Sequence, residues 1–117
     1  MIKQVLFEER DSILQSVYNI VLKNKHPGVQ IEYANNIDDF VNKAIKNQYD
    51  VLMSRGSNNT NQLAAAADIR KHGIDTPIHL FTGSSAHKTQ TKLNNIYVQE
   101  FADIRHICDV INQYTNT

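Results

Sequence analysis

The sequence carries no net charge, a single cysteine, and few prolines or glycines. Twelve basic side chains balance twelve acidic ones, so no excess of one sign attracts nucleic acid or an anionic membrane. We therefore expect this domain, taken alone, to bind neither of these partners. The only cysteine, Cys108, cannot form an internal disulfide, which is typical of proteins kept in a reducing compartment. We expect the cytoplasm.

Long hydrophobic runs and linker-like segments are also missing. The first residues, MIKQVLFEERD, contain too short an apolar stretch for a signal peptide or a membrane span. No stretch rich in proline, glycine and serine divides the 117 residues, and this length is typical of one domain. We therefore predict a single domain over residues 1–117.

Short apolar runs alternate with helical periodicities along the whole chain. The apolar runs predict five strands, at residues 5–7, 29–33, 51–53, 78–81 and 96–98. This alternation is typical of a parallel sheet covered by helices on both faces. With right-handed crossovers it predicts a flavodoxin-like α/β fold with three α/β/α layers and strand order 2-1-3-4-5. Residues 83–95 are polar and weakly periodic, so we expect the fourth helix to be short or frayed.

Local signals predict where the first helix begins and which side chains enter the core. Asp11 or Ser12 is the candidate N-cap, and Gln15 is placed to complete a capping box from Ser12. Apolar side chains then recur at helical spacing: Ile13, Leu14, Val17, Ile20 and Val21. His79 in the fourth strand and Cys108 in the last helix are both predicted to be core residues rather than reactive ones.

Polar side chains follow the predicted strands at the points where the strands end. In an open α/β sheet a ligand binds outside the carboxyl ends of the strands, near the point where the strand order reverses. Four strands contribute to this edge: Glu8 and Glu9, then Ser54, Arg55 and Gly56, then Thr82 and Gly83, and last Gln99 and Glu100. Carboxylates, hydroxyls, a guanidinium and an amide are therefore expected to share one rim.

Four segments at this rim carry a family resemblance. They read Leu6-Phe7-Glu8-Glu9-Arg10, Asp50-Val51-Leu52-Met53-Ser54, Thr76-Pro77-Ile78-His79-Leu80-Phe81-Thr82 and Val98-Gln99-Glu100-Phe101. Together they resemble the receiver domain of bacterial response regulators, the CheY-like family. That family has an acidic pair after its first strand, a phospho-accepting aspartate after its third, a threonine after its fourth and a lysine after its fifth. The resemblance covers nearly the whole chain and implies the same fold.

The resemblance breaks at the reactive positions. Ser54 stands where the family has its phospho-accepting aspartate, and Gln99 stands where it has the lysine. A serine hydroxyl is a poor nucleophile without an adjacent base, and a magnesium site without the third carboxylate loses a ligand. The resemblance therefore implies a degenerate phospho-acceptor pocket made by Glu8, Glu9, Ser54, Thr82 and Gln99. We expect no catalytic activity, no metal and no cofactor.

Two functions remain open for such a domain. We favour phosphorylation-independent signal transduction or transcriptional regulation, with a protein partner or a second copy bound by the fourth helix, the strand at 96–98 and the last helix at 104–111. The alternative is a small-ligand sensor, in which Arg55, Gly56 and Ser57 bind an anion. The Ser-Arg-Gly stretch resembles the N-terminal sensory domains of propionate-type transcriptional activators, which bind small organic acids. If Arg55 binds no anion, its guanidinium could instead pair with Glu8 or Glu9 and hold the pocket in one fixed state.

Overall fold

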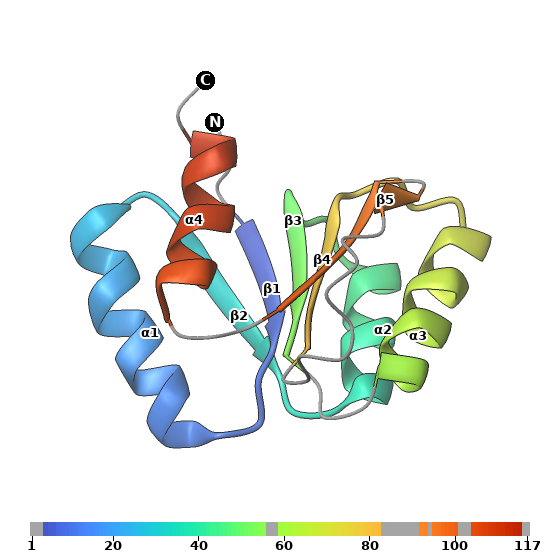
Figure 1. The fold of residues 1–117 in the computed structure, drawn as a ribbon, viewed down its shortest axis with the longest axis horizontal. Coiled ribbons are helices and arrows are strands. Elements are labelled where there is room, and N and C mark those ends of the chain that lie inside the picture. The colour runs from blue at the N-terminus through green and yellow to red at the C-terminus, as the bar shows by residue number, and fades with distance from the viewer. Residues whose placement is uncertain (1–3, 56–58, 83–91, 94, 101–103, 116–117) are drawn as a thin grey trace.

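The computed structural model describes residues 4–55, 59–82, 92–93, 95–100 and 104–115 (Figure 1). Its elements are β1 (Gln4–Glu8), α1 (Ser12–Lys25), β2 (Gln30–Ala34), α2 (Ile37–Lys46), β3 (Val51–Ser54), α3 (Asn59–Lys71), β4 (Ile78–Thr82), β5 (Lys92–Leu93), β6 (Ile96–Glu100) and α4 (Ile104–Thr115). None of the described helices is long and apolar enough to span a membrane.

The strands form one sheet in the order β2-β1-β3-β4-β6-β5. The first five strands of this order are parallel, which confirms the predicted flavodoxin-like topology. The short strand β5 pairs antiparallel with β6 at the edge of the sheet and was not predicted. It falls in the segment where we expected the fourth helix, and residues 83–91 of that segment lie outside the described part of the chain.

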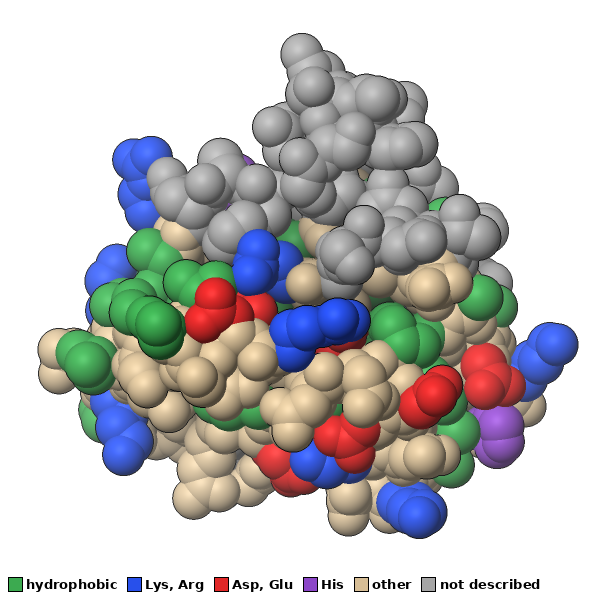
Figure 2. Space-filling model, turned by 90° about the horizontal axis from the view of Figure 1, so that it is seen from below, with side chains coloured by type: hydrophobic (Ala, Val, Ile, Leu, Met, Phe, Trp, Pro, Cys, Tyr) green, Lys and Arg blue, Asp and Glu red, His purple; other side chains and the backbone are tan. Residues whose placement is uncertain are grey.

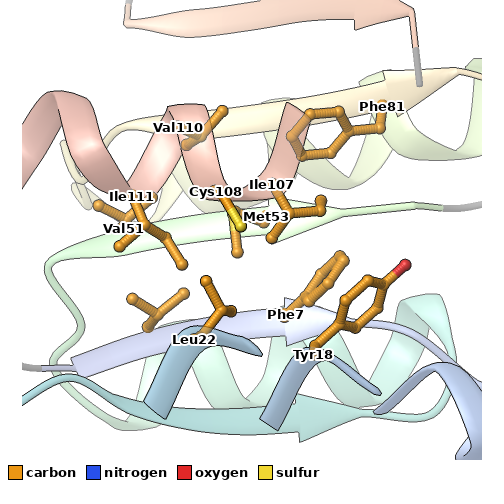
Figure 3. Packing of buried hydrophobic residues seen from close by; sticks show 11 residues of the cluster. Phe7, Tyr18, Leu22, Val51, Met53, Phe81, Ile107, Cys108, Val110 and Ile111 are labelled. Atoms are coloured by element: carbon orange, nitrogen blue, oxygen red, sulfur yellow. The ribbon is translucent and has the colours of Figure 1, made fainter. Parts of the chain in front are cut away.

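Helices cover both faces of the sheet, with α1 and α4 on one face and α2 and α3 on the other (Figure 1). Consecutive strand residues point to opposite faces of the sheet, so each central strand contributes side chains to two hydrophobic cores. Between the sheet and the α1–α4 layer, Phe7 and Met53 pack against Tyr18 and Ile107 (Figure 3). On the other face Leu6, Leu52 and Leu80 belong to a second cluster with Phe40 and Ile69. The strands read as continuous apolar runs because both faces are covered.

The first helix begins at Ser12, and Asp11 is its N-cap. The Asp11 carboxylate accepts hydrogen bonds from the backbone amides of Ile13, at 2.9 Å, and Leu14, at 3.3 Å. The predicted capping box between Ser12 and Gln15 is therefore wrong, because the cap lies one residue earlier. The Gln15 side chain instead donates a hydrogen bond to the backbone carbonyl of Glu9, which ties the start of the helix to the end of β1.

The apolar side chains of α1 divide between two faces of the helix. Tyr18 and Leu22 are buried against the sheet, and Leu14 and Val21 pack beside them. Other apolar residues of the helix are exposed, namely Ile13, Val17 and Ile20. The helical spacing of apolar residues thus predicted the helix correctly but did not show that one part of the set faces solvent.

His79 and Cys108 are core residues, as predicted. The His79 ring is buried, lies 2.7 Å from the Tyr114 hydroxyl through Nε2 and stacks on Tyr97 at 4.6 Å between ring centroids. Cys108 lies in the core between α4 and the sheet, and burial raises the pKa of its thiol. A higher pKa leaves less of the reactive thiolate.

Candidate functional site

The carboxyl ends of β1 and β3 lie side by side at one edge of the sheet, the lower edge in Figure 1. The strand register places Glu8 opposite Ser54, and Ser54 opposite Leu80 of β4. Figure 2 looks onto this edge and shows acidic and basic side chains close together on its described part. The edge also holds a group of polar side chains that are at most 1% exposed, namely Glu8, Glu9, Ser54 and Gln62.

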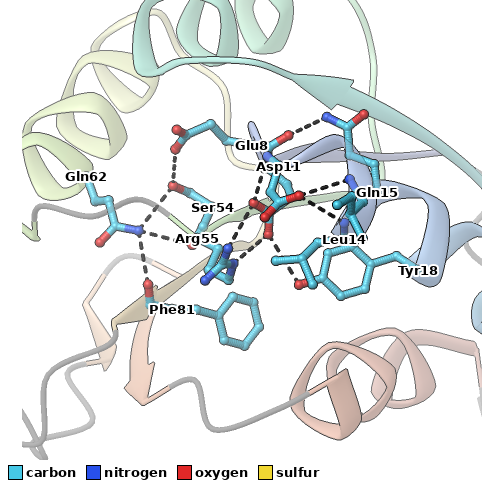
Figure 4. Close-up of polar contacts among 11 residues, drawn as sticks. Glu8, Asp11, Leu14, Gln15, Tyr18, Ser54, Arg55, Gln62 and Phe81 are labelled. Atoms are coloured by element: carbon cyan, nitrogen blue, oxygen red, sulfur yellow. Dashed lines mark hydrogen bonds and ion pairs between the residues drawn. The ribbon is translucent and has the colours of Figure 1, made fainter.

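Ser54 and Glu8 form a buried hydroxyl–carboxylate pair. The Ser54 hydroxyl is fully buried and donates a hydrogen bond of 2.5 Å to Glu8 Oε1 (Figure 4). Burial raises the pKa of the Glu8 carboxyl, and the hydrogen bond from Ser54 and the charge of Arg10 oppose this only in part. The side chain at the acceptor position is thus already bonded to one member of the acidic pair.

Glu9, the other member of the pair, is held by Arg55. The guanidinium makes a two-point contact, with Nε 2.5 Å from Oε1 and Nη2 3.0 Å from Oε2. The Tyr18 hydroxyl donates to Oε1 at 3.2 Å, and the Asp11 amide donates to Oε2 at 3.3 Å (Figure 4). The hydrogen bond to Glu9 raises the pKa of Arg55. Charge-assisted bonds of this geometry are among the strongest in proteins.

Gln62 of α3 closes the site from the side and was not predicted. Its Nε2 donates to the Ser54 carbonyl at 3.1 Å, to the Ser54 hydroxyl at 3.1 Å and to the Phe81 carbonyl at 3.2 Å. Its Oε1 is buried and has no hydrogen-bond partner within the described residues. Gln62 shares a helix face with Ala66 and Ile69, which are both buried. A glutamine at a buried helix position is the signal that could have identified it.

The structure tests the other predicted site residues unequally. It brings Glu8 together with Ser54, and it pairs Arg55 with Glu9, which is one of the arrangements that the sequence left open for Arg55. Thr82 lies opposite Glu100 in the β4–β6 register and Gln99 lies opposite Phe81, but only the backbone of Thr82 and Gln99 is described.

Gly56 and Ser57, the proposed anion-binding residues beside Arg55, lie outside the described residues. Within the described ranges, no cluster of three His, Cys, Asp or Glu side chains could hold a metal ion.

The comparisons with known proteins identify the fold. No protein-family model matches the sequence, and no curated protein does. Among solved structures, the receiver domain of a Francisella response regulator is 16% identical, with a TM-score of 0.71 over 97% of this chain and 98% of that one. The chain has the receiver-domain fold. An orphan response regulator of H. pylori is 15% identical, with a TM-score of 0.69 over 95% of this chain and 94% of that one.

A third similar structure was solved with a ligand. The response regulator TrrA from Thermotoga maritima, in complex with Mg²⁺-BeF, is 19% identical, with a TM-score of 0.65 over 95% of this chain and 97% of that one. At identities this low the likeness concerns the fold, and what the site can do has to be argued from its own residues.

The chemistry available at this edge is limited by how completely its groups are bonded to one another. Ser54 has a carboxylate neighbour that could accept its proton, which is the minimal arrangement for nucleophilic attack. However, its hydroxyl is fully buried and also accepts a hydrogen bond from Gln62, so no donor molecule can approach it in this conformation. Both carboxylate oxygens of Glu9 already accept hydrogen bonds from Arg55. The described part of the edge therefore favours a fixed internal network over a reactive site.

Proposed function

We propose that this chain is a receiver-like domain that acts in signal transduction or transcriptional regulation through protein contacts, without phosphorylation. The receiver-domain fold supports the signalling role. The observation that carries the rest is the bonding at the carboxyl edge, where Ser54 donates to Glu8 and Arg55 holds Glu9. Within the described residues, the acidic pair and the side chain at the phospho-acceptor position each have a partner inside the protein.

The first support concerns the nucleophile. A carboxylate attacks a phosphoryl donor directly, whereas a serine hydroxyl must lose its proton during the attack. Glu8 lies in position to take that proton, but the hydroxyl has no solvent exposure. Attack would require α3 to move Gln62 away from Ser54, with the loss of its hydrogen bonds to both Ser54 and Phe81.

The second support concerns the metal. Magnesium in phosphoryl-transfer sites is bound by one or two carboxylates with waters and phosphate oxygens. A magnesium ion at this edge would have to displace the Arg55 guanidinium from Glu9, which is 1% exposed. The metal would therefore have to replace both of the charge-assisted hydrogen bonds that the Glu9 carboxylate accepts from Arg55. The ion pair therefore opposes the binding of magnesium, and with it the binding of a phosphoryl group that would need the metal.

The contact surface we propose is the face formed by β6 and α4, together with the segment that precedes β6. The exposed side chains in the described part of α4 are polar or charged, namely Arg105, Asp109, Asn112 and Gln113. A polar helix face of this kind suits a reversible contact, since transient interfaces are about as polar as ordinary protein surface. The function we propose is therefore binding rather than catalysis.

The proposal is tested by incubation of the protein with acetyl phosphate and magnesium, followed by intact-mass spectrometry. We expect no change in mass under conditions in which an aspartate-bearing receiver, run in parallel, gains one phosphoryl group. A gain that resists hydroxylamine and disappears in Ser54→Ala would place an ester on Ser54. A gain that hydroxylamine removes would place an acyl phosphate on a carboxylate. Either gain would contradict the proposal.

The organic-acid sensor makes a different prediction about Arg55. An anionic ligand would have to compete with the Glu9 carboxylate for the guanidinium, so binding should be accompanied by a break in the ion pair. A thermal-shift screen against small organic acids separates the two functions, because a ligand that binds the native state raises the melting temperature with dose. A rise that disappears in Arg55→Ala but persists in Arg10→Ala would favour the sensor.

A further inference from the structure

The outer face of α1 carries an apolar stripe that the fold does not use. Ile13, Val17 and Ile20 are 74%, 39% and 65% exposed. They follow one another at intervals of four and three residues, which places them on one side of the helix. Tyr18 and Leu22 anchor the opposite side in the core. Figure 2 shows hydrophobic side chains gathered on the part of the surface that α1 forms. We call these three residues the α1 stripe.

The stripe is unusual within the described surface. Among the described residues, one further large apolar side chain is exposed. It is Leu63 of α3, on the other face of the sheet, and it is 47% exposed. An isolated exposed apolar residue needs no explanation, but a contiguous group commonly marks an interaction site. The α1 stripe is such a group, whereas Leu63 stands alone and provides a matched control.

We propose that two copies of this chain associate through antiparallel packing of their α1 helices, with the two Val17 side chains at the two-fold axis. The stripe is nearly symmetric about Val17, because Ile13 lies four residues before it and Ile20 three residues after it. An antiparallel pair therefore brings Ile13 of each copy close to Ile20 of the other. This is the self-complementary contact that a two-fold dimer requires.

The charges around the stripe favour a second copy in this orientation. Residues 12–22 contain no charged side chain, so the face offers nothing to a strongly charged partner. Asp11 lies at the start of α1, and Lys23 and Lys25 lie in its last turn. Antiparallel packing brings the Asp11 end of one helix to the lysine end of the other and opposes the two helix dipoles, whereas parallel packing would bring like ends together.

Sedimentation equilibrium across micromolar to millimolar concentrations tests the association. We expect the mean mass to rise from 13.3 kDa towards twice that value as the concentration increases, because a contact made by one helix face is a small and therefore transient interface. Val17→Glu would bring two carboxylates together at the axis and weaken association at least about tenfold. Leu63→Glu should leave it unchanged. A wild type that stays monomeric, or a Val17→Glu dimer of unchanged affinity, would overturn the proposal.

Both glutamate variants should fold, because both positions are exposed and glutamate is about as good a helix former as leucine and a better one than valine. Far-ultraviolet circular dichroism and the melting temperature check this. If Val17→Glu failed to fold, Ile20→Lys, at the more exposed position, would replace it with the same expected loss of association. An unchanged Ile20→Lys dimer would equally overturn the proposal.

Disulfide trapping tests the orientation. With Val17→Cys at the axis, the two new thiols should lie close enough to form an intermolecular disulfide under mild oxidation. Asn24→Cys lies on the same helix face, but antiparallel packing separates its two copies by about 21 Å along the axis, from a rise of 1.5 Å per residue. We expect only Val17→Cys to cross-link, and the buried Cys108 stays protected in both variants. Equal cross-linking of both variants would overturn the antiparallel arrangement.

Discussion

At the carboxyl edge of the sheet, polar side chains are buried and bonded to one another, whereas on the outer face of α1, apolar side chains are exposed. Ser54, Glu8 and Glu9 have almost no contact with solvent, while Ile13 and Ile20 are mostly exposed. Burial of a polar group is tolerated when its hydrogen bonds are made inside the protein. The described part of the edge therefore has little left to offer a ligand, whereas the exposed apolar side chains of α1 would gain from burial against a partner.

The largest effect should come from a charge added to the buried edge. Ser54→Asp would place a second carboxylate within hydrogen-bond distance of Glu8, at a position with no solvent exposure. We expect the free energy of unfolding to fall by about 3–5 kcal/mol at pH 7, the range for an uncompensated buried charge. The loss should shrink at pH 5, because one carboxyl of the pair takes up a proton. Urea denaturation at both pH values measures this.

Ser54→Ala is the control for that experiment. It removes the hydroxyl that donates to Glu8 and adds no charge, so the cost should be about 1–3 kcal/mol. The relief at low pH should be smaller than for Ser54→Asp, because only the hydrogen bond to the charged Glu8 carboxylate is lost. If Ser54→Asp were as stable as the wild type at pH 7, the carboxyl edge would be open to solvent. That result would contradict the claim that this edge is buried while the outer face of α1 is exposed.

A smaller loss should follow when the ion pair is broken. Arg55→Ala would leave the buried Glu9 carboxylate with hydrogen bonds from Tyr18 and Asp11 but without its cation. Since the Arg55 side chain is 30% exposed, water can replace part of its contact, and we expect about 2–4 kcal/mol. Arg10→Ala, on the same edge but exposed, should cost under about 1 kcal/mol. Equal effects of the two substitutions would show that the Arg55 contact is an ordinary surface pair.

The smallest effect concerns pH. Burial raises the pKa of Glu8 above its unfolded value of 4.5, so the folded state binds a proton more readily than the unfolded state does. The contribution of Glu8 to the free energy of unfolding should therefore rise as the pH falls from neutral towards 4.5, and it should level off below pH 4.5. Glu8→Gln removes the titration and should flatten the profile across that window. Denaturant titrations at several pH values compare the two proteins, and identical profiles would contradict the burial of a charged Glu8.

The sequence predicted the fold well because strand and helix patterns are local. The continuous apolar runs around Phe7, Met53 and Leu80 are those of strands covered on both faces, and the parallel order followed from the alternation with helices. The sequence left the helix cap open between Asp11 and Ser12, because both are good caps and only the chain path decides between them, and the capping box drawn from Ser12 was wrong. The two-residue strand β5 was missed because so short a segment has no periodicity to detect.

The site was predicted less completely, since its contacts join residues distant in sequence. The strand ends predicted that Glu8, Ser54 and Arg55 lie at one edge, but periodicity did not reveal that Arg55 pairs with Glu9 rather than with Glu8. That choice follows from which side of the strand end each glutamate occupies. Gln62 was missed because its partners, Ser54 and Phe81, lie on two different strands. The α1 stripe was missed because apolar residues fill two faces of one helix, so their spacing does not indicate which face is buried.

The most direct test of the closed carboxyl edge is binding of magnesium with beryllium fluoride, the combination present in the TrrA structure. Backbone amide resonances would be followed by NMR while both are added to millimolar concentrations. With Glu9 held by Arg55 and Ser54 bonded to Glu8, the account predicts no saturable shift at Glu8, Glu9, Ser54 or Arg55. Saturable shifts at these amides in the wild type, absent from Ser54→Ala, would show an open phosphoryl site and contradict the account.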